Sequence, residues 1–267
     1  MIVKWLTVRE AARGPVVTYA LIAGCCLAFL LGPASGLNPA YGTGDRLLAT
    51  GTAYFRHWGV VPDELFSGAA RPLLTPLTAL FVHGSWLHLL GNMLFLHVFG
   101  AMTQERMGRA PFLVFYVCTG YLALAAYAAA NASSDQTLVG ASGAISAVLG
   151  AFLCLFPRAR VTSLFPFLLF LPLRFPAWIV LMFWFVLQWL AAQRAESGPG
   201  VAYLAHVVGF SVGFLYAWAR YRRTGKRRPV LAEWPIARTR RGRAPVDGGG
   251  AGDDGTGFGD PTDHVLK

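Results

Sequence analysis

Charged side chains are scarce in this 267-residue chain, where Asp, Glu, Lys and Arg make up 13% of the residues and hydrophobic residues make up 55%. Soluble domains carry about 25% charged residues, so roughly half of the usual solubilising surface is missing. This shortage all but excludes a water-soluble globular enzyme, and the hydrophobic excess argues against a disordered chain.

Cysteine is also rare, and none of the four cysteines has the CxxC or Cys/His spacing of a zinc site. They lie in apolar stretches, at Cys25, Cys26, Cys118 and Cys154. We interpret them as small buried hydrophobic side chains, so the sequence predicts no disulfide framework and no structural metal.

Long uncharged runs, by contrast, are abundant. Six stretches contain no Asp, Glu, Lys or Arg: residues 15–44, 72–104, 110–134, 136–157, 175–193 and 197–219. A helix of about 20 residues crosses a hydrocarbon core of about 30 Å, and a helix satisfies its own backbone polar groups, as lipid requires. The sequence therefore predicts an all-α polytopic membrane protein, a bundle of six transmembrane helices. Residues 161–173 are too short to cross and lie among prolines, which predicts an interfacial or re-entrant connection before the fifth span.

Lysine and arginine are unevenly distributed around these runs. With the N-terminus inside, the cytoplasmic segments hold most of the basic residues next to the spans, including Arg106, Arg109 and a cluster after residue 219. Positive charge marks the cytoplasmic side of membrane proteins, so we predict that both termini lie in the cytoplasm. Anionic lipid headgroups then account for the formal net charge of +10, and no nucleic-acid partner is predicted.

The composition divides the chain into three parts. Residues 1–14 form a cytoplasmic N-terminal segment, residues 15–221 the membrane domain, and residues 222–267 a tail that is first basic and then rich in Gly and Asp. Such a tail cannot bury enough apolar surface to fold, so we predict that it is disordered. The size of the chain and its compact loops favour the inner membrane of a bacterium. The sequence makes no prediction of the oligomeric state.

Polar side chains are rare within the runs, because lipid makes them costly, and they usually face the interior of a helix bundle. The second run contains His83, His88, Asn92 and His97. His88 and Asn92 are four residues apart and share one helix face, whereas His83 lies about 140° around the helix from His88. A single histidine within a membrane usually makes a helix-to-helix hydrogen bond, and we interpret His97 in this way.

The fourth run begins with a serine between two glycines. Ser142 lies between Gly140 and Gly143, and Ser146 and Gly150 follow on its face at four-residue steps. One interpretation is helix packing, because small residues let another helix approach closely. The other is catalytic, because such a turn exposes the hydroxyl and a helix N-terminus leaves backbone N–H groups free to stabilise an oxyanion.

The sixth run has a histidine on a similar face of small residues. His206, Gly209 and Gly213 have the spacing i, i+3 and i+7. Two helices with such faces can approach closely enough for Ser142 and His206 to form a hydrogen bond, and a serine hydroxyl needs a neighbouring base before it can attack. Because no run contains Asp or Glu, this pair would act as a dyad without an orienting carboxylate.

Together these motifs resemble the rhomboid intramembrane serine proteases. The resemblance extends from residue 71 to residue 220 and is carried by four segments in order: His83-x4-His88-x3-Asn92, Gly100 to Gly108, Gly140-Ala-Ser-Gly, and Ala205-His-x2-Gly-x3-Gly. It implies six helices around a water-accessible cavity that opens to the outside, with a short serine helix that starts below the membrane surface.

The resemblance also implies a role for each matched residue. Ser142 would be the nucleophile and His206 the general base and acid. His88 and Asn92, with the backbone N–H of Ser142, would bind the oxyanion. The other matched residues would have structural or supporting roles: His83, Gly140, Gly143, Gly209, Gly213, Glu105, Arg106 and Arg71. Glu105 and Arg106 would form an ion pair or a helix-end cap, and Arg71 would help to fix the outer loop.

Two positions depart from the family pattern. The residue four after the serine is commonly aromatic and stacks on the histidine ring, but here it is Ser146. The loop arginine usually follows a tryptophan, but here it follows Ala70. Neither departure removes a reacting group, although the first leaves His206 to be oriented by other neighbours.

The resemblance predicts a serine endopeptidase that cuts transmembrane segments of other membrane proteins near the outer face of the bilayer. It would need no cofactor, and its partners would be its membrane-protein substrates and membrane lipid. One alternative is a catalytically inactive rhomboid-like protein that binds membrane clients, although such relatives typically lack the serine or the histidine. Another is a small-molecule transporter with a histidine proton relay, which would need carboxylates within the spans.

Overall fold

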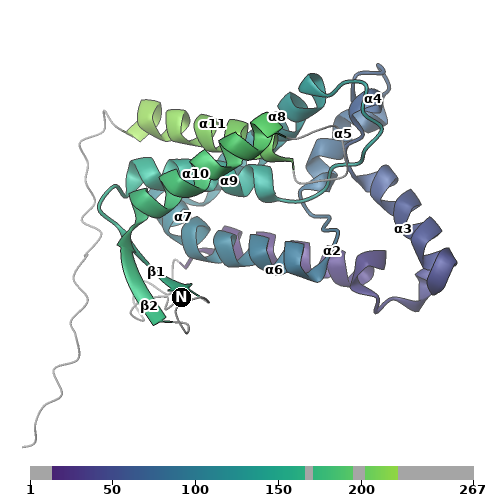
Figure 1. The fold of residues 1–267 in the computed structure, drawn as a ribbon, viewed down its shortest axis with the longest axis horizontal. Coiled ribbons are helices and arrows are strands. Elements are labelled where there is room, and N and C mark those ends of the chain that lie inside the picture. The colour runs from purple at the N-terminus through teal and green to yellow at the C-terminus, as the bar shows by residue number, and fades with distance from the viewer. Residues whose placement is uncertain (1–13, 166–170, 195–201, 222–267) are drawn as a thin grey trace, which may run out of the picture. The chain divides into compact units, whose positions relative to one another are not determined.

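The computed structural model describes residues 14–165, 171–194 and 202–221, and these residues are mostly helical (Figure 1). The elements in chain order are α2 (Val16–Leu31), η1 (Pro33–Ser35), η2 (Pro39–Tyr41), α3 (Gly44–Trp58), α4 (Pro62–Leu65), α5 (Ala70–Ala79), α6 (Trp86–Phe95), η3 (Leu96–Gly100), α7 (Ala101–Met107), α8 (Arg109–Ala130), α9 (Ser142–Leu155), β1 (Arg160–Phe165), β2 (Leu171–Pro176), α10 (Ala177–Arg194) and α11 (Tyr203–Tyr221). The predicted N-terminal segment, apart from Gly14, and the predicted tail lie outside the described residues.

Each of the six uncharged runs contains helix. The second run holds most of α5 and, after a break, most of the continuous helical segment Trp86–Met107, in which the π-helical turn η3 joins α6 to α7. Among the described residues, Trp86–Met107 and Arg109–Ala130 are long and apolar enough to cross a membrane, whereas α2, α9 and α10 are apolar but shorter. The structure thus has the helical, apolar character that was predicted, and the number of spans stays a prediction.

The two longest runs hold helices that are shorter than the runs themselves. α2 ends before Gly32, which is extended (φ −85°, ψ 170°), and Pro33 follows it. The second helical segment begins well inside its run, at Trp86, where the side chain of Ser85 accepts a hydrogen bond of 3.2 Å from the backbone N–H of His88. The connection between these two segments folds into the short helices α3, α4 and α5, which the charge pattern did not predict.

The connection before α10 is an antiparallel hairpin. β1 and β2 pair from Arg160 opposite Pro176 to Phe165 opposite Leu171. The sequence predicted an interfacial or re-entrant connection here and no strand, because prolines around a short apolar stretch indicate only that a helix is interrupted. A two-stranded sheet has only edge strands, which tolerate proline where one side of the strand is unpaired. The all-α prediction is therefore incomplete at this connection.

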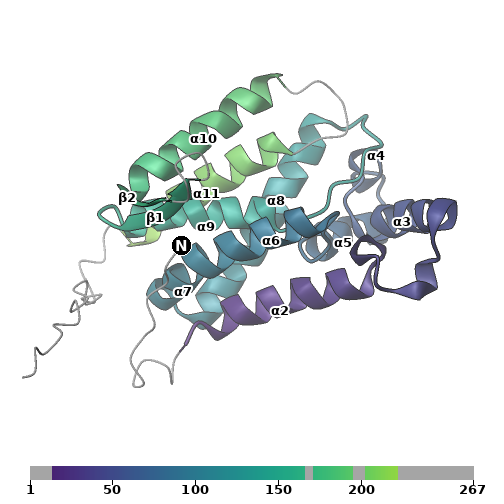
Figure 2. The same ribbon diagram turned by 60° about the horizontal axis from the view of Figure 1, so that its bottom comes forward.

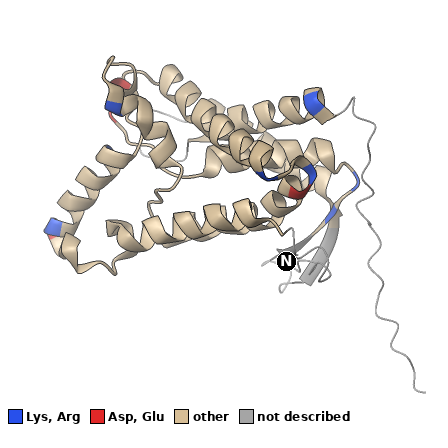
Figure 3. Cartoon of the chain, turned by 180° about the vertical axis from the view of Figure 1, so that it is seen from behind, with Lys and Arg blue, Asp and Glu red and all other residues tan. Residues whose placement is uncertain are grey.

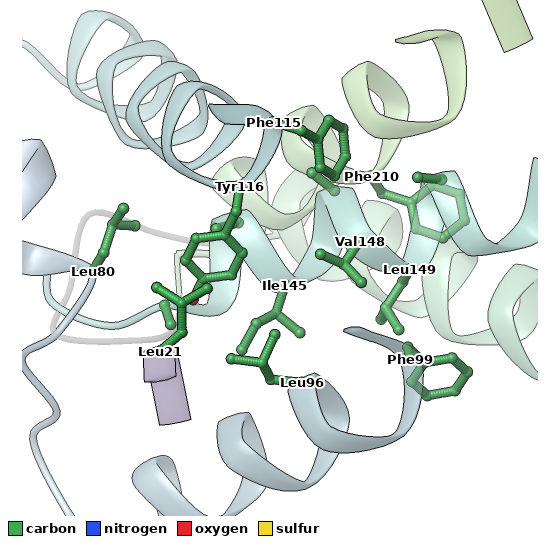
Figure 4. Packing of buried hydrophobic residues seen from close by; sticks show 14 of the residues in the cluster. Leu21, Leu80, Leu96, Phe99, Phe115, Tyr116, Ile145, Val148, Leu149 and Phe210 are labelled. Carbon is green, nitrogen blue, oxygen red and sulfur yellow. The ribbon is translucent and has the colours of Figure 1, made fainter. Parts of the chain in front are cut away.

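α9 lies at the centre of the described helices and packs against α8, α10, α11 and η3 (Figures 1 and 2). Its residues are buried from Gly143 to Phe152, as expected for a helix that is apolar on all sides. Figure 4 shows side chains of the core that α9 forms with its neighbours; labelled are Leu21, Leu80, Leu96, Phe99, Phe115, Tyr116, Ile145, Val148, Leu149 and Phe210. Because α9 cannot move without repacking its neighbours, the position of its N-terminus is fixed.

The outward faces of the surrounding helices expose large apolar side chains. Leu87 is 82% exposed, Val114 62% and Phe183 64%. Figure 3 shows that the described Lys, Arg, Asp and Glu lie at helix ends and in connections. Water would make such a surface unfavourable, whereas lipid tails are as apolar as these side chains. The exposed surface therefore suits a protein embedded in a membrane.

Candidate catalytic site

Backbone contacts hold the segment that leads to Ser142. Val60 and Leu138 exchange two backbone hydrogen bonds of 2.9 and 2.7 Å, and the N–H of Gly140 donates to the carbonyl of Ala79 at 2.9 Å. Gly140 has a φ of +119°, a conformation that favours glycine. The chain turns at this residue, and α9 begins two residues later at Ser142. The serine hydroxyl therefore stands at the first residue of a buried helix.

α11 approaches α9 backbone to backbone at two glycines. A Cβ at Gly209 would lie 2.2 Å from the carbonyl oxygen of Gly143, and a Cβ at Gly213 would lie 2.0 Å from the carbonyl oxygen of Ala147. No side chain fits at either position, as is typical of closely packed membrane helices. The two faces of small residues that the sequence indicates are therefore in contact with each other.

This close approach brings Ser142 and His206 together. The Oγ atom of Ser142 lies 2.8 Å from Nε2 of His206, although 64 residues separate the two in the chain. His206 is buried, with 7% of its surface exposed, and Ser142 is half-buried. An imidazole nitrogen in this position can take the hydroxyl proton as the oxygen attacks. The arrangement has the parts that acyl transfer needs, a nucleophile and its base.

The other ring nitrogen of His206 contacts a residue that the sequence analysis missed. Nδ1 of His206 lies 2.8 Å from Oε1 of Gln188, which belongs to α10. The sequence did carry a signal, because an amide inside an apolar run is costly unless it faces the bundle interior. The sequence predicted no orienting group for His206, because none of the six runs contains Asp or Glu.

The aromatic neighbours of His206 do not come from α9. Ser146, at the position where the family commonly has an aromatic residue, instead donates a hydrogen bond of 2.7 Å from its hydroxyl to the carbonyl of Ser142. The ring of Trp184 on α10 lies 6.1 Å from the imidazole at an interplanar angle of 31°, and the ring of Tyr203 lies 6.4 Å away and edge-on. The imidazole is therefore surrounded by α10 and by its own helix.

The two predicted oxyanion donors lie differently with respect to Ser142. The imidazole of His88 lies against the backbone just before the serine, because a Cβ at Gly140 would be 2.7 Å from its Cε1 and Nε2 atoms. Asn92 is buried, and its Nδ2 donates to the carbonyl of His88 at 2.9 Å. Within the described residues neither side chain forms a hydrogen bond with Ser142 itself. The oxyanion role of this pair stays a prediction.

The remaining histidines of the second run have separate surroundings. His83 is buried, its ring centre lies 5.1 Å from that of His88, and its Nδ1 lies 3.2 Å from the carbonyl of Phe81. His97 lies against Tyr19 of α2, with 5.7 Å between the ring centres. The helix-to-helix hydrogen bond predicted for His97 is not found among the described residues, and a ring contact between two helices takes its place.

Arg71 lies in the first turn of α5 and contacts residues of α3 and α4. Its Nη1 lies 2.9 Å from Nδ1 of His57 and 3.3 Å from the carbonyl of the same residue, and its Nη2 lies 3.9 Å from Glu64. Glu64 also pairs with Arg56. These contacts join α3, α4 and α5. The loop-fixing role that the resemblance implies for Arg71 stays a prediction.

Arg106 lies at the other end of the helices from these contacts. It stands at the end of α7, and its guanidinium lies over the ring of Tyr221 at 5.5 Å from the ring centre. This contact joins the ends of α7 and α11. Across the described parts of the chain, no three His, Cys, Asp or Glu side chains gather in a way that could hold a metal ion.

Comparisons with known proteins agree with the motifs. A family model described as Rhomboid domain matches residues 71–223, more than half of the chain and a range that contains every candidate site residue named above. Rhomboid protein 1, mitochondrial, of Saccharomyces cerevisiae is similar to this chain, with 34% identity over 147 residues. That match covers 52% of this chain and 39% of the relative's length.

Proposed function

The chain belongs to the rhomboid family, and from this premise we propose that it is a serine endopeptidase that cleaves transmembrane segments of other membrane proteins within the bilayer. The observation that carries the proposal is the 2.8 Å contact between Oγ of Ser142 and Nε2 of His206. A relative that only binds clients has no need to hold a serine and an imidazole at hydrogen-bond distance across two helices. The contact therefore favours the active enzyme over the inactive binding protein.

The proposed reaction is an acyl transfer in two halves. Oγ of Ser142 attacks the scissile carbonyl while Nε2 of His206 takes the hydroxyl proton, which it then gives to the leaving amine. Water activated by the same imidazole hydrolyses the acyl-enzyme. The negative charge that develops on the carbonyl oxygen is held by the backbone N–H of Ser142 and by the side chains of His88 and Asn92.

The proposal includes the placement of the chain in its membrane. The six apolar helical segments are proposed to be six spans, with both termini in the cytoplasm and the serine near the outer face. The distribution of Lys and Arg supports this orientation, and the size and compact loops of the chain favour a bacterial inner membrane. The partners are membrane-protein substrates and lipid, and the reaction needs no cofactor.

A fluorophosphonate probe tests the proposal directly. Such a probe forms a covalent bond only with a serine that a base activates, so detergent-solubilised protein should be labelled and heat-denatured protein should not. Ser142→Ala and His206→Ala should each abolish labelling, because the first removes the nucleophile and the second removes its base. Ser211→Ala is the matched control, since Ser211 also lies on α11 but is five residues after His206, about 140° around the helix. Its labelling should equal that of the natural chain.

Two results would contradict the proposal. Labelling that persists in Ser142→Ala would show that another residue is the nucleophile. Absence of labelling in the natural, folded chain, together with absence of cleavage of any single-span protein in liposomes, would favour the inactive client-binding protein.

A substitution at Gly140 tests whether the position of His88 matters for the reaction. A control at another glycine separates that steric effect from backbone strain. Gly140→Ala places a Cβ 2.7 Å from the imidazole of His88, so the ring must move and the rate of cleavage should fall by about tenfold or more, as for a weakened oxyanion donor. Gly68→Ala is the control, because Gly68 also has a positive φ (+84°) but nothing lies within 4 Å of its Cβ position.

Both variants carry the same kind of backbone penalty, about 1–2 kcal/mol of stability. Thermal unfolding should therefore show a destabilisation in both, larger in Gly140→Ala because the His88 ring must also move. Only Gly140→Ala should slow peptide cleavage. Equal rates for Gly140→Ala and Gly68→Ala would show that the position of His88 next to Gly140 does not matter for the reaction.

A further inference from the structure

We infer that Gln188 is the positioning residue that fixes the tautomer and the orientation of His206, the task that a carboxylate performs in a Ser-His-Asp triad. The inference rests on the proposed function, and it extends that function to a residue that none of the matching motifs contains. Its starting point is a chain of two contacts, each of 2.8 Å: Oε1 of Gln188 to Nδ1 of His206, and Nε2 of His206 to Oγ of Ser142.

The packing of α10 directs Gln188 toward the bundle. Ala177 and Leu181 are each 1% exposed, and Trp184 and Gln188 continue the same face at helical spacing. Residues between these positions, such as Phe183, face outward. Trp184 also contacts the imidazole one helical turn before Gln188. The amide therefore lies on the face of α10 that meets α11, and the packing of the helix holds it next to His206.

The chemistry of the amide decides which ring nitrogen carries the proton. The side-chain carbonyl oxygen of glutamine only accepts hydrogen bonds, and in the orientation with Oε1 toward the ring, Nδ1 of His206 is the donor. A neutral imidazole has one N–H, and when that proton is on Nδ1 the lone pair of Nε2 faces the hydroxyl of Ser142. With the other tautomer Nε2 would carry a proton and could not act as the base. Gln188 thus selects the reactive tautomer.

A neutral orienting group also suits the surroundings of the imidazole. The titratable groups that face His206 from the described elements are Ser142 of α9, His88 of α6 and Tyr203 of its own helix, and no described carboxylate or cation lies against the ring. A carboxylate in place of Gln188 would add a charge where lipid and buried side chains make charge costly. The amide orients the ring without that cost.

Substitutions at Gln188 test the inference in the full-length protein in liposomes, with a quenched fluorescent transmembrane peptide as substrate. Gln188→Leu removes the acceptor, and kcat should fall by about tenfold or more, the factor that corresponds to one ordinary hydrogen bond, while KM stays unchanged. Gln188→Glu restores an acceptor and should recover much of kcat. Its carboxylate also stabilises the protonated imidazole, so the acid limb of the pH–rate profile should move to higher pH.

Gln193 provides the matched control, because it is the other glutamine of α10 and its side chain is exposed. Gln193→Leu and Gln193→Glu should leave kcat, KM and the pH–rate profile as in the natural chain. A residue that only helped α10 to pack would alter stability in Gln188→Leu and would not move the pH–rate profile in Gln188→Glu.

A measurement that does not depend on activity completes the test. Nitrogen-15 NMR of His206 should show the proton on Nδ1 in the natural chain and a loss of that preference in Gln188→Leu. A proton on Nε2 in the natural chain overturns the inference, and so does an acid limb that does not move in Gln188→Glu, even if Gln188→Leu fails to fold. Failure of the proposed function would give a different result. The natural chain would neither react with the probe nor cleave the peptide, although its His206 would carry the proton on Nδ1.

Discussion

Asn92→Ala should lower kcat for peptide cleavage by about 10²–10³-fold, the usual cost of removing one oxyanion donor from a serine hydrolase. KM and thermal stability should change little, because the lost interaction exists mainly in the transition state. The Nδ2 group of Asn92 has two hydrogens, and one of them is donated to the carbonyl of His88 at 2.9 Å. The second is available for the developing oxyanion while the first keeps the amide in place.

His88→Ala should have an effect of the same size for a related reason. Its imidazole lies against the backbone of Gly140, two residues before the serine. From there it can donate a hydrogen bond to the oxygen of the carbonyl whose carbon Ser142 attacks. The double variant His88→Ala/Asn92→Ala should lose less than the product of the two single losses if both groups bind the same oxygen.

His97→Ala is the control for these substitutions. His97 lies within the same continuous helical segment, but its ring contacts Tyr19 of α2 and not the site. Cleavage assays of the purified variants in liposomes, at several substrate concentrations, separate kcat from KM. A loss of less than threefold in Asn92→Ala would remove that residue from the oxyanion site, and an equal loss in His97→Ala would show that the effect is a general disturbance of the helix.

The positions of the helices could be predicted because lipid imposes one simple rule on composition. An uncharged run of about 20 residues that lies in a membrane has the length of a helix and not of a barrel strand, and each of the six runs does contain helix. The ends of the helices were less predictable, because the absence of charge continues past Gly32 and begins well before Ser85, where backbone conformation and capping set the boundaries. The hairpin β1–β2 was missed for the same reason, since strand pairing across prolines leaves no mark in a count of charges.

Only part of the candidate site, likewise, could be predicted from the sequence. The sequence indicated that Ser142 and His206 lie on faces of small residues, and two such faces have few ways to pack other than against each other. The amide of Gln188 inside an apolar run was a general signal only. The rotation of α10 about its axis depends on packing, and the apolar residues around the rest of the helix do not reveal which face is inside. The same rotation places Trp184 next to the imidazole of His206. On α9, the position that is commonly aromatic in the family is Ser146.

The contact between α9 and α11 leads to the prediction with the largest effect on the fold. Gly213→Ala adds a single Cβ, which would lie 2.0 Å from the carbonyl oxygen and 2.6 Å from the Cα of Ala147. Both atoms belong to the backbone of a buried helix, so neither can rotate away. The two helices must separate, and we expect a loss of about 3 kcal/mol or more in the free energy of unfolding, at or beyond the upper end for an overpacked core.

Separation of the helices should also stop the reaction, since the same contact sets the 2.8 Å distance between Ser142 and His206. Gly91→Ala is the matched control, because Gly91 is also inside a helix and nothing lies within 4 Å of its Cβ position; it should keep both stability and cleavage. Ala147→Gly should not rescue Gly213→Ala, because the conflict is with the backbone of residue 147 and not with its side chain. Thermal unfolding in detergent and peptide cleavage in liposomes measure the two effects, and a Gly213→Ala variant as stable and active as Gly91→Ala would show that α9 and α11 do not meet at this glycine.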